Sequence, residues 1–465
     1  MLRTHTCGEL REKDVGKQVI LCGWVHSIRS MSKMVFIDLR DRYGITQIII
    51  PKENISNFPE ISNIHNEYVI KVQGIVQKKP QENPKLETGK IEVLVNQIDV
   101  LNVSSELPIS IIDNIVPSEE TRLKYRYLDL RKPENLDNFL FRHKIVSAVR
   151  EYLNSQNFIE VDTPMLCRST PEGARDYLVP SRLHPGKFYS LPQSPQVYKQ
   201  TLMVSGFDRY YQFAKCLRDE DLRGDRQPEF TQIDLEMSFV TMEDIQKLHE
   251  EYLSYTLEKV MGIKIKTPFP HLTYKEAMKQ YNSDKPDLRK DKTNPKEFAF
   301  VWVDYFPLFE WNDEEQRLVS AHHPFTAPTK ESLERLNQCV TKEDFLSLDS
   351  QAFDLVLNGV ELGSGSIRIW NSDIQKKIFK ILGLSDEEIK EKFGFLIDAF
   401  KFGTPPHGGL AVGLERLLML LKGKDSIKEF IAFPKTKNGV ALMENSPNFV
   451  SEKQLKDVHI KALKE

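Results

Sequence analysis

Five short runs of β-type residues follow one another between residues 17 and 101, and turn signals such as DRYG and KPQENPKLETG separate them. The runs read KQVILCGWVHSI, KMVFIDLRD, GITQIII, EYVIKVQGIVQ and GKIEVLVNQIDVL. In the fourth run, Ile70, Val72, Gly74 and Val76 recur at every second position, which is typical of a strand with one buried face. Five strands in so short a stretch predict a small Greek-key barrel of the OB type, a fold that commonly binds oligonucleotides. An ordinary β-barrel with a solvated outer face is the alternative.

The rest of the chain has a different pattern. Residues 105–133 combine prolines with a charged run and are typical of a linker or hinge. A helix is predicted to begin near Glu134, because Ile145, Val149 and Leu153 recur at near-helical spacing. Beyond residue 158, strand and helix patterns mix without regular βαβ alternation, and residues 384–396 (LSDEEIKEKFGFL) have the pattern of an amphipathic helix. We therefore expect an α+β multidomain chain: a barrel over 1–104, a hinge over 105–133, and a domain on an antiparallel sheet flanked by helices over 134–465.

Composition sets outer limits on the function. The chain has 465 residues and a formal net charge of −3, which neither requires nor excludes a polyanionic partner. The cysteines are five in number and widely spaced, so neither a disulfide framework nor a zinc ribbon is expected. No apolar run approaches the roughly 20 residues of a membrane span, and the first residues contain no apolar signal core. We expect a cytoplasmic protein with no membrane partner.

Several familiar motifs are absent or weak. No GxxxxGK[ST] occurs, which excludes a P-loop. His322 and His323 are adjacent, whereas two zinc ligands on one helix face need a spacing of three or four, so a zinc pair is disfavoured. SMSK (30–33) lies between two predicted barrel strands, and we treat its likeness to a nucleotide-binding loop as coincidence.

A dense run of charges lies between two strand-like stretches in KCLRDEDLRGDRQPEFTQIDLE (215–236). The second stretch alternates at Phe230, Gln232, Asp234 and Glu236. Two strands joined by a charged loop would hold Arg218 on a rigid base, and arginine suits phosphate because its planar fork offers paired donors. A surface hairpin laced with salt bridges explains the same residues equally well.

A second candidate anion site is GGLAVGLERLLMLLKG (408–423). The leucines predict a buried helix, and Arg416 lies near its beginning, where the helix dipole favours anions. A salt-bridged arginine on a core helix is the commoner alternative.

Three longer stretches carry a family resemblance. NFIEVDTPML (157–166), FAKCLRDEDLRGDRQPEFTQIDLE (213–236) and GLAVGLERL (409–417) resemble, in the correct order, motifs 1, 2 and 3 of class II aminoacyl-tRNA synthetases. TPEGARDYLVPSR, LPQSPQVYKQ, AHHPFT and NGVELGSGSIRI are similar to bacterial-type aspartyl-tRNA synthetases of subclass IIb. The match runs from THTCGELR to IAFPKTKNG, which is almost the whole chain. The resemblance implies an OB-fold anticodon-binding domain over 1–104 and a class II catalytic domain over 134–465.

The resemblance also implies a two-step reaction. Aspartate attacks the α-phosphate of ATP to give aspartyl-adenylate and pyrophosphate, and the aspartyl group then passes to the 3′-terminal adenosine of the tRNA. A carboxylate is already ionised near neutral pH, so the first step needs positioning and positive charge but no general base.

Site residues follow from the same resemblance. The catalytic set is Arg218, Arg416 and Glu361. The aspartate set is Glu172 (for the ammonium), Ser194, Gln196, Lys199, Arg218, Gln232, His322 and Arg368, in which Lys199 and Arg368 hold the side-chain carboxylate. The ATP set is Arg218, Asp219, Glu220, Gln227, Glu361, Gly413, Leu414, Glu415 and Arg416. Asp354 and Glu361 are the expected Mg²⁺ ligands, since Mg²⁺ prefers oxygen.

Partners are implied as well. The barrel would bind the tRNA anticodon through Arg29, Phe36, Gln47 and Glu92, because unstacked bases expose faces for stacking and edges for hydrogen bonds. For Phe36 alone, a barrel-core aromatic is an equal alternative. A homodimer is expected, since motif 1 with Pro164 forms the subunit interface in the family.

The sequence departs from the family in three places. Bacterial members usually carry an extra domain between motifs 2 and 3, whereas here SDKPDLR (283–289) is followed by a short loop near 290–299, so we expect activity with altered tRNA handling. The basic run after the first barrel strand is reduced to HSIRS (26–30), and motif 3 has Glu415 where aspartate is more usual.

Two other functions stay open. The first is an asparaginyl-tRNA synthetase, which shares the barrel and the three motifs, although Lys199 favours aspartate as the substrate. The second is a non-catalytic paralogue that only binds RNA. Whether tRNA(Asn) is charged beside tRNA(Asp) is also open, with Met31 favouring strict specificity because relaxed members tend to have histidine there.

Overall fold

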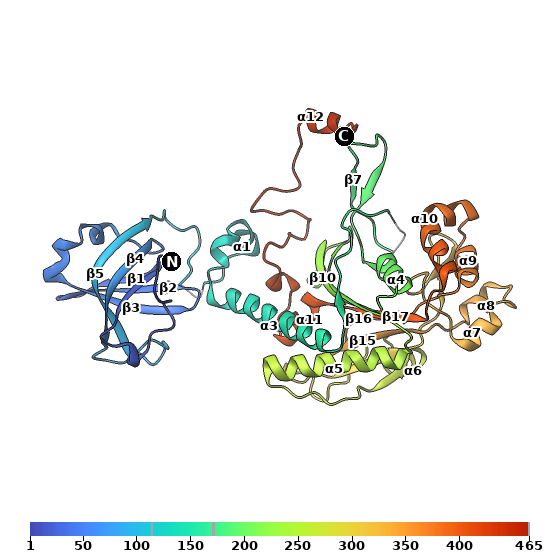
Figure 1. The fold of residues 1–465 in the computed structure, drawn as a ribbon, viewed down its shortest axis with the longest axis horizontal. Coiled ribbons are helices and arrows are strands. Elements are labelled where there is room, and N and C mark those ends of the chain that lie inside the picture. Colours follow the sequence, from blue (N-terminus) through green and yellow to red (C-terminus); the bar gives the residue numbers. More distant parts are fainter. Residues whose placement is uncertain (113–114, 170–172, 464–465) are drawn as a thin grey trace. The chain divides into compact units, whose positions relative to one another are not determined.

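A computed structural model describes residues 1–112, 115–169 and 173–463 of the chain (Figure 1). The chain divides into two compact units, residues 1–136 and 137–465. Across the described residues, no helix is both long enough and apolar enough to cross a membrane.

The first unit contains the predicted barrel. In the described part of this unit, five strands close in the order β1-β2-β3-β5-β4, and all pairs are antiparallel except β3 with β5. The strands are β1 (Gln18–Ser30), β2 (Met34–Asp41), β3 (Gly44–Pro51), β4 (Val69–Lys78) and β5 (Ile91–Asn102). Ile70, Val72 and Val76 are buried in the barrel core, as their alternation predicts. Ser30 is the last residue of β1, and residues 31–33 connect β1 to β2.

The segment predicted as a hinge contains two short helices, α1 (Glu119–Lys124) and α2 (Arg126–Asp129). The Ser118 hydroxyl accepts from the backbone N–H of Thr121 and so caps α1, a signal that the prolines of this segment obscured.

The second unit is built on a large sheet that is mostly antiparallel. Counted over the described residues it has eight strands, in the order β11-β12-β15-β16-β17-β10-β9-β6. They are β6 (Ile159–Glu160), β9 (Arg209–Leu217), β10 (Glu229–Ser238), β11 (His271–Thr273), β12 (Phe300–Asp304), β15 (Ala352–Leu357), β16 (Val360–Ile367) and β17 (His407–Gly413). Only the outermost pairs, β6 with β9 and β11 with β12, are parallel within these ranges. The predicted α+β chain with an antiparallel sheet is confirmed.

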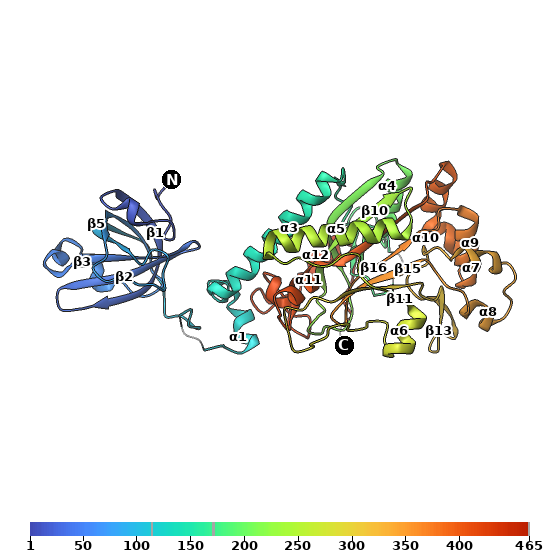
Figure 2. The ribbon, with the colours of Figure 1, turned by 90° about the horizontal axis from the view of Figure 1, so that it is seen from below.

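Two long helices cover one face of this sheet. Figure 2 shows α3 (Pro133–Ser155) and α5 (Met242–Met261) side by side across it. The predicted residues Ile145, Val149 and Leu153 of α3 join Leu253 and the strand side chains in one core. A third helix, α11 (Leu414–Leu421), packs into the same core with Leu414, Leu417, Leu418 and Leu421, as the leucine pattern predicts.

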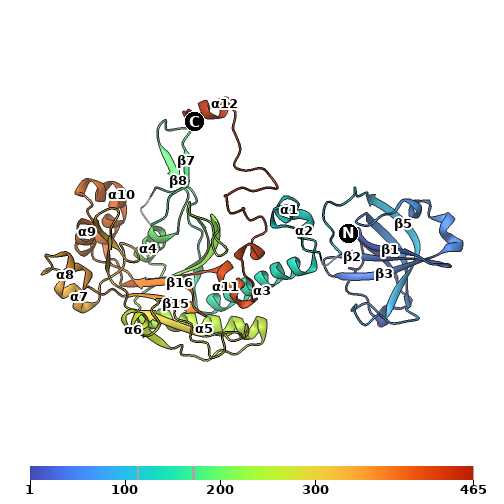
Figure 3. The same cartoon turned by 180° about the vertical axis from the view of Figure 1, so that it is seen from behind.

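A smaller group of helices lies at one end of the sheet. Val197 of α4 (Gln196–Val204), Phe379 of α9 (Ser372–Ile381) and Phe393 of α10 (Asp386–Ala399) share a second apolar cluster, and Figure 3 shows these helices together. The predicted amphipathic helix over 384–396 is therefore confirmed as α10. The remaining elements are β7 (Leu178–Pro180), β8 (Phe188–Ser190), α6 (Tyr274–Tyr281), β13 (Phe309–Asn312), β14 (Arg317–Ser320), α7 (Lys330–Arg335), α8 (Lys342–Leu346) and α12 (Glu452–Asp457).

Candidate active site

A cavity of about 570 Å³ lies in the second unit, over strands β10, β16 and β17. Most of the residues that the sequence predicts for the catalytic, aspartate and ATP sites line it. They are Ser194, Gln196, Lys199, Arg218, Glu220, Gln227, Gln232, His322, Glu361, Arg368, Gly413, Glu415 and Arg416. Segments up to some 220 residues apart in sequence, such as those of Gln196 and Arg416, therefore meet at one place.

Arg218 follows directly after β9 at the base of the charged loop. Its backbone N–H donates to the Pro228 carbonyl oxygen at 3.0 Å, which holds it where the β9–β10 pair opens. The guanidinium carbon lies 5.1 Å from the centre of the Phe230 ring, and Nε donates to the Gln193 carbonyl oxygen at 3.4 Å. Arg218 therefore stands at the end of a paired strand, as the sequence predicts, and it lines the cavity.

Arg416 enters the cavity from the first turn of α11. Its Nη1 donates to the Glu361 carbonyl oxygen at 2.8 Å, and its Nη2 lies 3.3 Å from a carboxylate oxygen of Asp225, in the charged loop. The neighbouring Glu415 is buried and has a different role, because its carboxylate accepts from the Thr231 N–H at 2.8 Å and from Arg142 at 3.0 Å. Glu415 therefore fixes α11 to β10, and so fixes the base of Arg416.

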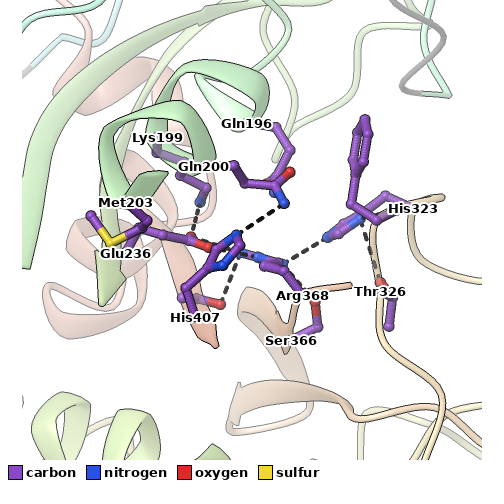
Figure 4. A network of polar contacts seen from close by, with 12 residues as sticks. Gln196, Lys199, Gln200, Met203, Glu236, His323, Thr326, Ser366, Arg368 and His407 are labelled. Carbon is purple, nitrogen blue, oxygen red and sulfur yellow. Dashed lines mark hydrogen bonds and ion pairs between the residues drawn. The ribbon is translucent and has the colours of Figure 1, made fainter. Parts of the chain in front are cut away.

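Arg368 is the centre of a buried polar network (Figure 4). Nε and Nη2 donate to the two oxygens of Glu236 at 2.9 and 3.1 Å, and Nη2 also donates to the Gly409 carbonyl oxygen at 3.1 Å. Nη1 donates to Ser366 Oγ at 2.6 Å and to His323 Nε2 at 2.8 Å. The bidentate pair is the geometry that makes arginine specific for carboxylates.

Lys199 brings a second cation to the same network. Its Nζ lies 2.6 Å from Asp234 Oδ1 and 3.3 Å from Glu236 Oε2, and its side chain is buried. Burial raises the pKa of Asp234 even though Lys199 opposes the rise. Burial also opposes ionisation of Glu236, but Arg368 and Lys199 outweigh it and hold the pKa of that carboxyl below its usual value. Two cations thus face two acids in a water-poor pocket.

The two adjacent histidines have separate positions. Burial lowers the pKa of His322 to about 4, and the ring shares a hydrogen bond with the Ser364 hydroxyl at Nδ1 (2.8 Å). Burial and then the Arg368 charge lower the pKa of His323 well below its ordinary value, which suits a neutral ring that accepts from Arg368. Neither residue belongs to a cluster of three or more possible metal ligands anywhere in the described ranges.

Asp354 and Glu361 form an acidic pair on the neighbouring strands β15 and β16. Asp354 is buried, its Oδ1 has no hydrogen-bond partner among the described residues, and the nearest His322 nitrogen is 3.7 Å away. Burial and then the Glu361 charge raise the pKa of Asp354 well above its usual value. Burial also opposes ionisation of Glu361, but Lys285, at 3.0 Å, and Arg416 hold the pKa of that carboxyl below normal. An unpartnered carboxylate oxygen beside a second carboxylate fits a Mg²⁺ that takes its remaining ligands from water and phosphate.

Some predicted residues lie elsewhere. Glu172 falls outside the described residues. Asp219, Asp354 and Leu414 do not line the cavity, and the Leu414 side chain is in the core. Sequence reasoning missed other residues that line it, among them Asp225, Phe230, Asp234, Lys285 and His323. Phe230 and Asp234 share the β10 face of Gln232, so the alternation along that strand already contained the signal.

The predicted anticodon residues lie on the outer face of the barrel strands, where Arg29 is exposed, Phe36 is half-buried, and Gln47 and Glu92 are buried. The register pairs Arg29 with Phe36 and Asp38 with Gln47, and it places Gln47 beside Glu92 through the parallel β3–β5 contact. Phe36 is half-buried between the core residues Val35 and Ile37, so it faces outward and is not the core aromatic that was the alternative. Arg29 is paired with Asp38 at 3.0 Å, and Gln47 accepts from Lys79.

Comparison with known families agrees with both units. Residues 118–437 match the family described as "tRNA synthetases class II (D, K and N)", and residues 19–101 match the family described as "OB-fold nucleic acid binding domain".

Curated relatives match the chain from end to end. An "Aspartate--tRNA(Asp/Asn) ligase" of Caldanaerobacter subterraneus subsp. tengcongensis is 43% identical, with 99% of this chain and 98% of the relative covered. A protein of the same name from Aquifex aeolicus is 41% identical over 99% and 98%. The alignment to the first relative spans 586 positions against the 465 residues of this chain, so at least 121 of them lie opposite gaps here.

Solved structures share the fold. The asparaginyl-tRNA synthetase of Pyrococcus horikoshii, complexed with asparaginyl-adenylate, has a TM-score of 0.75 at 23% identity and covers 94% of this chain and 99% of that one. The aspartyl-tRNA synthetase of Entamoeba histolytica has a TM-score of 0.70 at 23% identity, with 92% and 90% covered.

Proposed function

Because this chain belongs to the class II tRNA synthetases of the D, K and N group, and its full-length relatives are aspartate–tRNA ligases, we propose that the cavity activates aspartate with ATP and transfers it to tRNA. The chain aspartylates tRNA by class II chemistry. The observation that carries the proposal is that Arg218 and Arg416 line one cavity together with the Arg368–Lys199 pocket.

In the activation step the α-carboxylate of aspartate forms a bond to the α-phosphorus, and the bond from that phosphorus to the bridging oxygen breaks. The electron pair leaves with pyrophosphate, so negative charge grows on the leaving group while the attacking carboxylate oxygen loses charge. Arg218 holds the α-phosphate and Arg416 the γ-phosphate, and both guanidinium groups are pre-oriented by neighbouring carbonyl oxygens. No group has to take a proton from the nucleophile, because a carboxylate is already ionised near neutral pH.

The Arg368–Lys199 pocket selects the side chain of aspartate. Of the partners of Arg368, only His323 lines the cavity, whereas Glu236, Ser366 and Gly409 do not. A substrate carboxylate therefore reaches Arg368 at Nη1, in place of His323. Asparagine would turn an amide NH₂ toward these donors and leave them unpaired, which costs more than a lost contact.

Mg²⁺ fits the acidic pair of Asp354 and Glu361. When bound, the ion neutralises charge on the phosphate oxygens. The chain contributes the two carboxylates, one of them with an unpartnered oxygen. The assignment of Glu172 to the substrate ammonium stays a prediction from the sequence, and so does a cytoplasmic location.

The tRNA partners extend the proposal. The curated relatives described above are named for both tRNA(Asp) and tRNA(Asn). We therefore favour charging of both, against the expectation from Met31, which is exposed in the turn between β1 and β2. A homodimer through motif 1 is supported by Ile159, Met165 and Leu166, which are 49%, 41% and 52% exposed in the isolated chain.

Amino-acid-dependent exchange of pyrophosphate into ATP tests the function. Exchange should occur with aspartate and fall by at least about a thousandfold with asparagine, given the cost of buried donors left unpaired. Exchange with asparagine instead, or no exchange at all, would overturn the proposal. Parallel charging of purified tRNA(Asp) and tRNA(Asn) tests whether both are substrates. A charging rate for tRNA(Asn) no higher than background would contradict dual specificity.

A further inference from the structure

Lys285 is a cavity-lining cation that the activation step described above does not use. It lies between α6 and β12, in the segment 282–299 where the chain is shorter than the family pattern. Its Nζ is 3.0 Å from Glu361 Oε2, and its side chain is 40% exposed. It therefore approaches the cavity from a segment separate from the charged loop that carries Arg218.

The backbone around Lys285 is anchored. Leu288 packs against an apolar cluster that contains Val303 and Val356 from the sheet. Arg289 and Asp287 form a bidentate pair at 2.8–3.3 Å. Asp287 also packs closely on Gly359, because a Cβ added to Gly359 would lie 3.2 Å from the Asp287 Cβ. Gly359 also has φ +82°, which only glycine adopts freely. A packed turn therefore fixes the backbone from which the Lys285 side chain extends toward Glu361.

Glu361 is held by two cations at once. Its carboxylate meets Lys285, and its carbonyl oxygen accepts from Arg416 at 2.8 Å. Lys285 and Arg416 are consequently fixed to the same residue, at the same end of the cavity. Arg416 is the side chain to which the proposed function gives the γ-phosphate, so Lys285 lies where the outer phosphates would be.

We propose that Lys285 binds the outer phosphates of ATP and the pyrophosphate that leaves, as a third cation beside Arg218 and Arg416. The inference rests on the proposed function. An ammonium is a compact point charge on a flexible stem, so it can contact phosphate oxygens and keep Glu361 within reach. When the α-phosphorus bond to the bridging oxygen breaks, the electron pair goes to pyrophosphate, and Lys285 stabilises that added charge.

A purely structural counter-ion for Glu361 is the competing explanation. The two differ in what they predict for separate substrates. A phosphate contact affects ATP and pyrophosphate and leaves aspartate alone, whereas a structural ion pair affects stability or all substrates together. Lys285→Met removes the charge and keeps most of the stem, Lys285→Arg restores a cation, and Lys290→Met removes an exposed charge from the same segment as the matched control.

Steady-state exchange with aspartate measures the effect. Lys285→Met should raise KM for ATP and for pyrophosphate about tenfold, a typical loss of one charge-assisted contact, with KM for aspartate within about twofold of wild type. Lys285→Arg should recover most of the loss, and Lys290→Met should match wild type. Unchanged KM values for ATP and pyrophosphate, or an equal rise for aspartate, would overturn the inference.

Calorimetric binding of magnesium pyrophosphate separates this inference from the proposed function. The wild-type chain should bind it about tenfold more tightly than Lys285→Met, whether or not exchange occurs. Equal affinity refutes the contact, whereas a difference in affinity without any aspartate-dependent exchange keeps the contact and refutes the proposed function.

Discussion

Arg368 donates two parallel hydrogen bonds to Glu236, from Nε at 2.9 Å and from Nη2 at 3.1 Å, and both side chains are almost wholly buried. With Ser366, Gly409 and His323 as further acceptors, every nitrogen of the guanidinium has a partner. A buried cation in this setting is fixed in one orientation. Among these partners, His323, which accepts from Nη1, lines the cavity.

Arg368→Lys therefore keeps the charge and loses the fork. We expect kcat/KM for aspartate in the exchange reaction to fall by at least about a hundredfold, which corresponds to roughly 3 kcal/mol. KM for ATP should change far less, because Arg218 and Arg416 are untouched. Arg335→Lys, at an exposed arginine of α7, is the control. A loss below fivefold would show that a point charge is enough and that the bidentate geometry has no part in recognition.

The alternation of apolar residues and the resemblance to family motifs predicted much of the fold and of the cavity. The barrel strands, the antiparallel sheet, the α10 helix and the buried face of α11 all followed from local patterns of apolar residues, because burial of one face is a local constraint. Arg218, Arg368 and Arg416 followed from motifs. The alternation of Val35 and Ile37 also contained the outward direction of Phe36.

Asp225 and Lys285 could not be predicted in the same way. Asp225 contacts Arg416, about 190 positions further along the chain, and Lys285 contacts Glu361, 76 positions further along. Among several charges in a loop, the one that reaches the cavity depends on how the loop folds back. That is a tertiary property with no periodic signature.

Asp225 gives a second prediction. Its carboxylate lies 3.3 Å from Nη2 of Arg416, the side chain to which the proposed function gives the γ-phosphate. Asp225 is 44% exposed, so the pair contributes little to stability. Asp225→Asn should lower KM for ATP by about twofold to fivefold, since a competing anion is removed. Asp221→Asn, an exposed acid of the same loop, should leave KM unchanged. A rise in KM for Asp225→Asn would mean that Asp225 orients Arg416 for the nucleotide.

Phe36 gives a prediction for tRNA alone. Stacking of a base on an aromatic side chain is worth about 1–3 kcal/mol, so Phe36→Ala should raise KM for tRNA about tenfold or more. The exchange reaction needs no tRNA and should be unaffected. Ile75→Ala removes an exposed apolar side chain from β4 and is the control. Equal tRNA kinetics for Phe36→Ala and wild type would remove Phe36 from the anticodon site.

His271 gives a prediction for stability. Its Nδ1 lies 2.7 Å from Asp304 Oδ2, and this hydrogen bond raises the pKa of His271 above its ordinary value of 6.5. The folded chain therefore holds the proton more tightly than the unfolded chain does. The hydrogen bond to Asp304 therefore stabilises the fold fully at pH values below the pKa that His271 has in the unfolded chain. This stabilisation is lost as the pH rises through the pKa that His271 has in the folded chain.

Unfolding by urea can measure this contribution. The difference in unfolding free energy between wild type and His271→Gln should be larger at about pH 5.5 than at about pH 8.5, because the ring is charged only in the first case. His184→Gln, at an exposed histidine between β7 and β8, should show the same difference from wild type at both values. If the difference for His271→Gln grows as the pH rises, a neutral ring makes the stronger bond to Asp304, and the direction assigned to the His271 pKa is wrong.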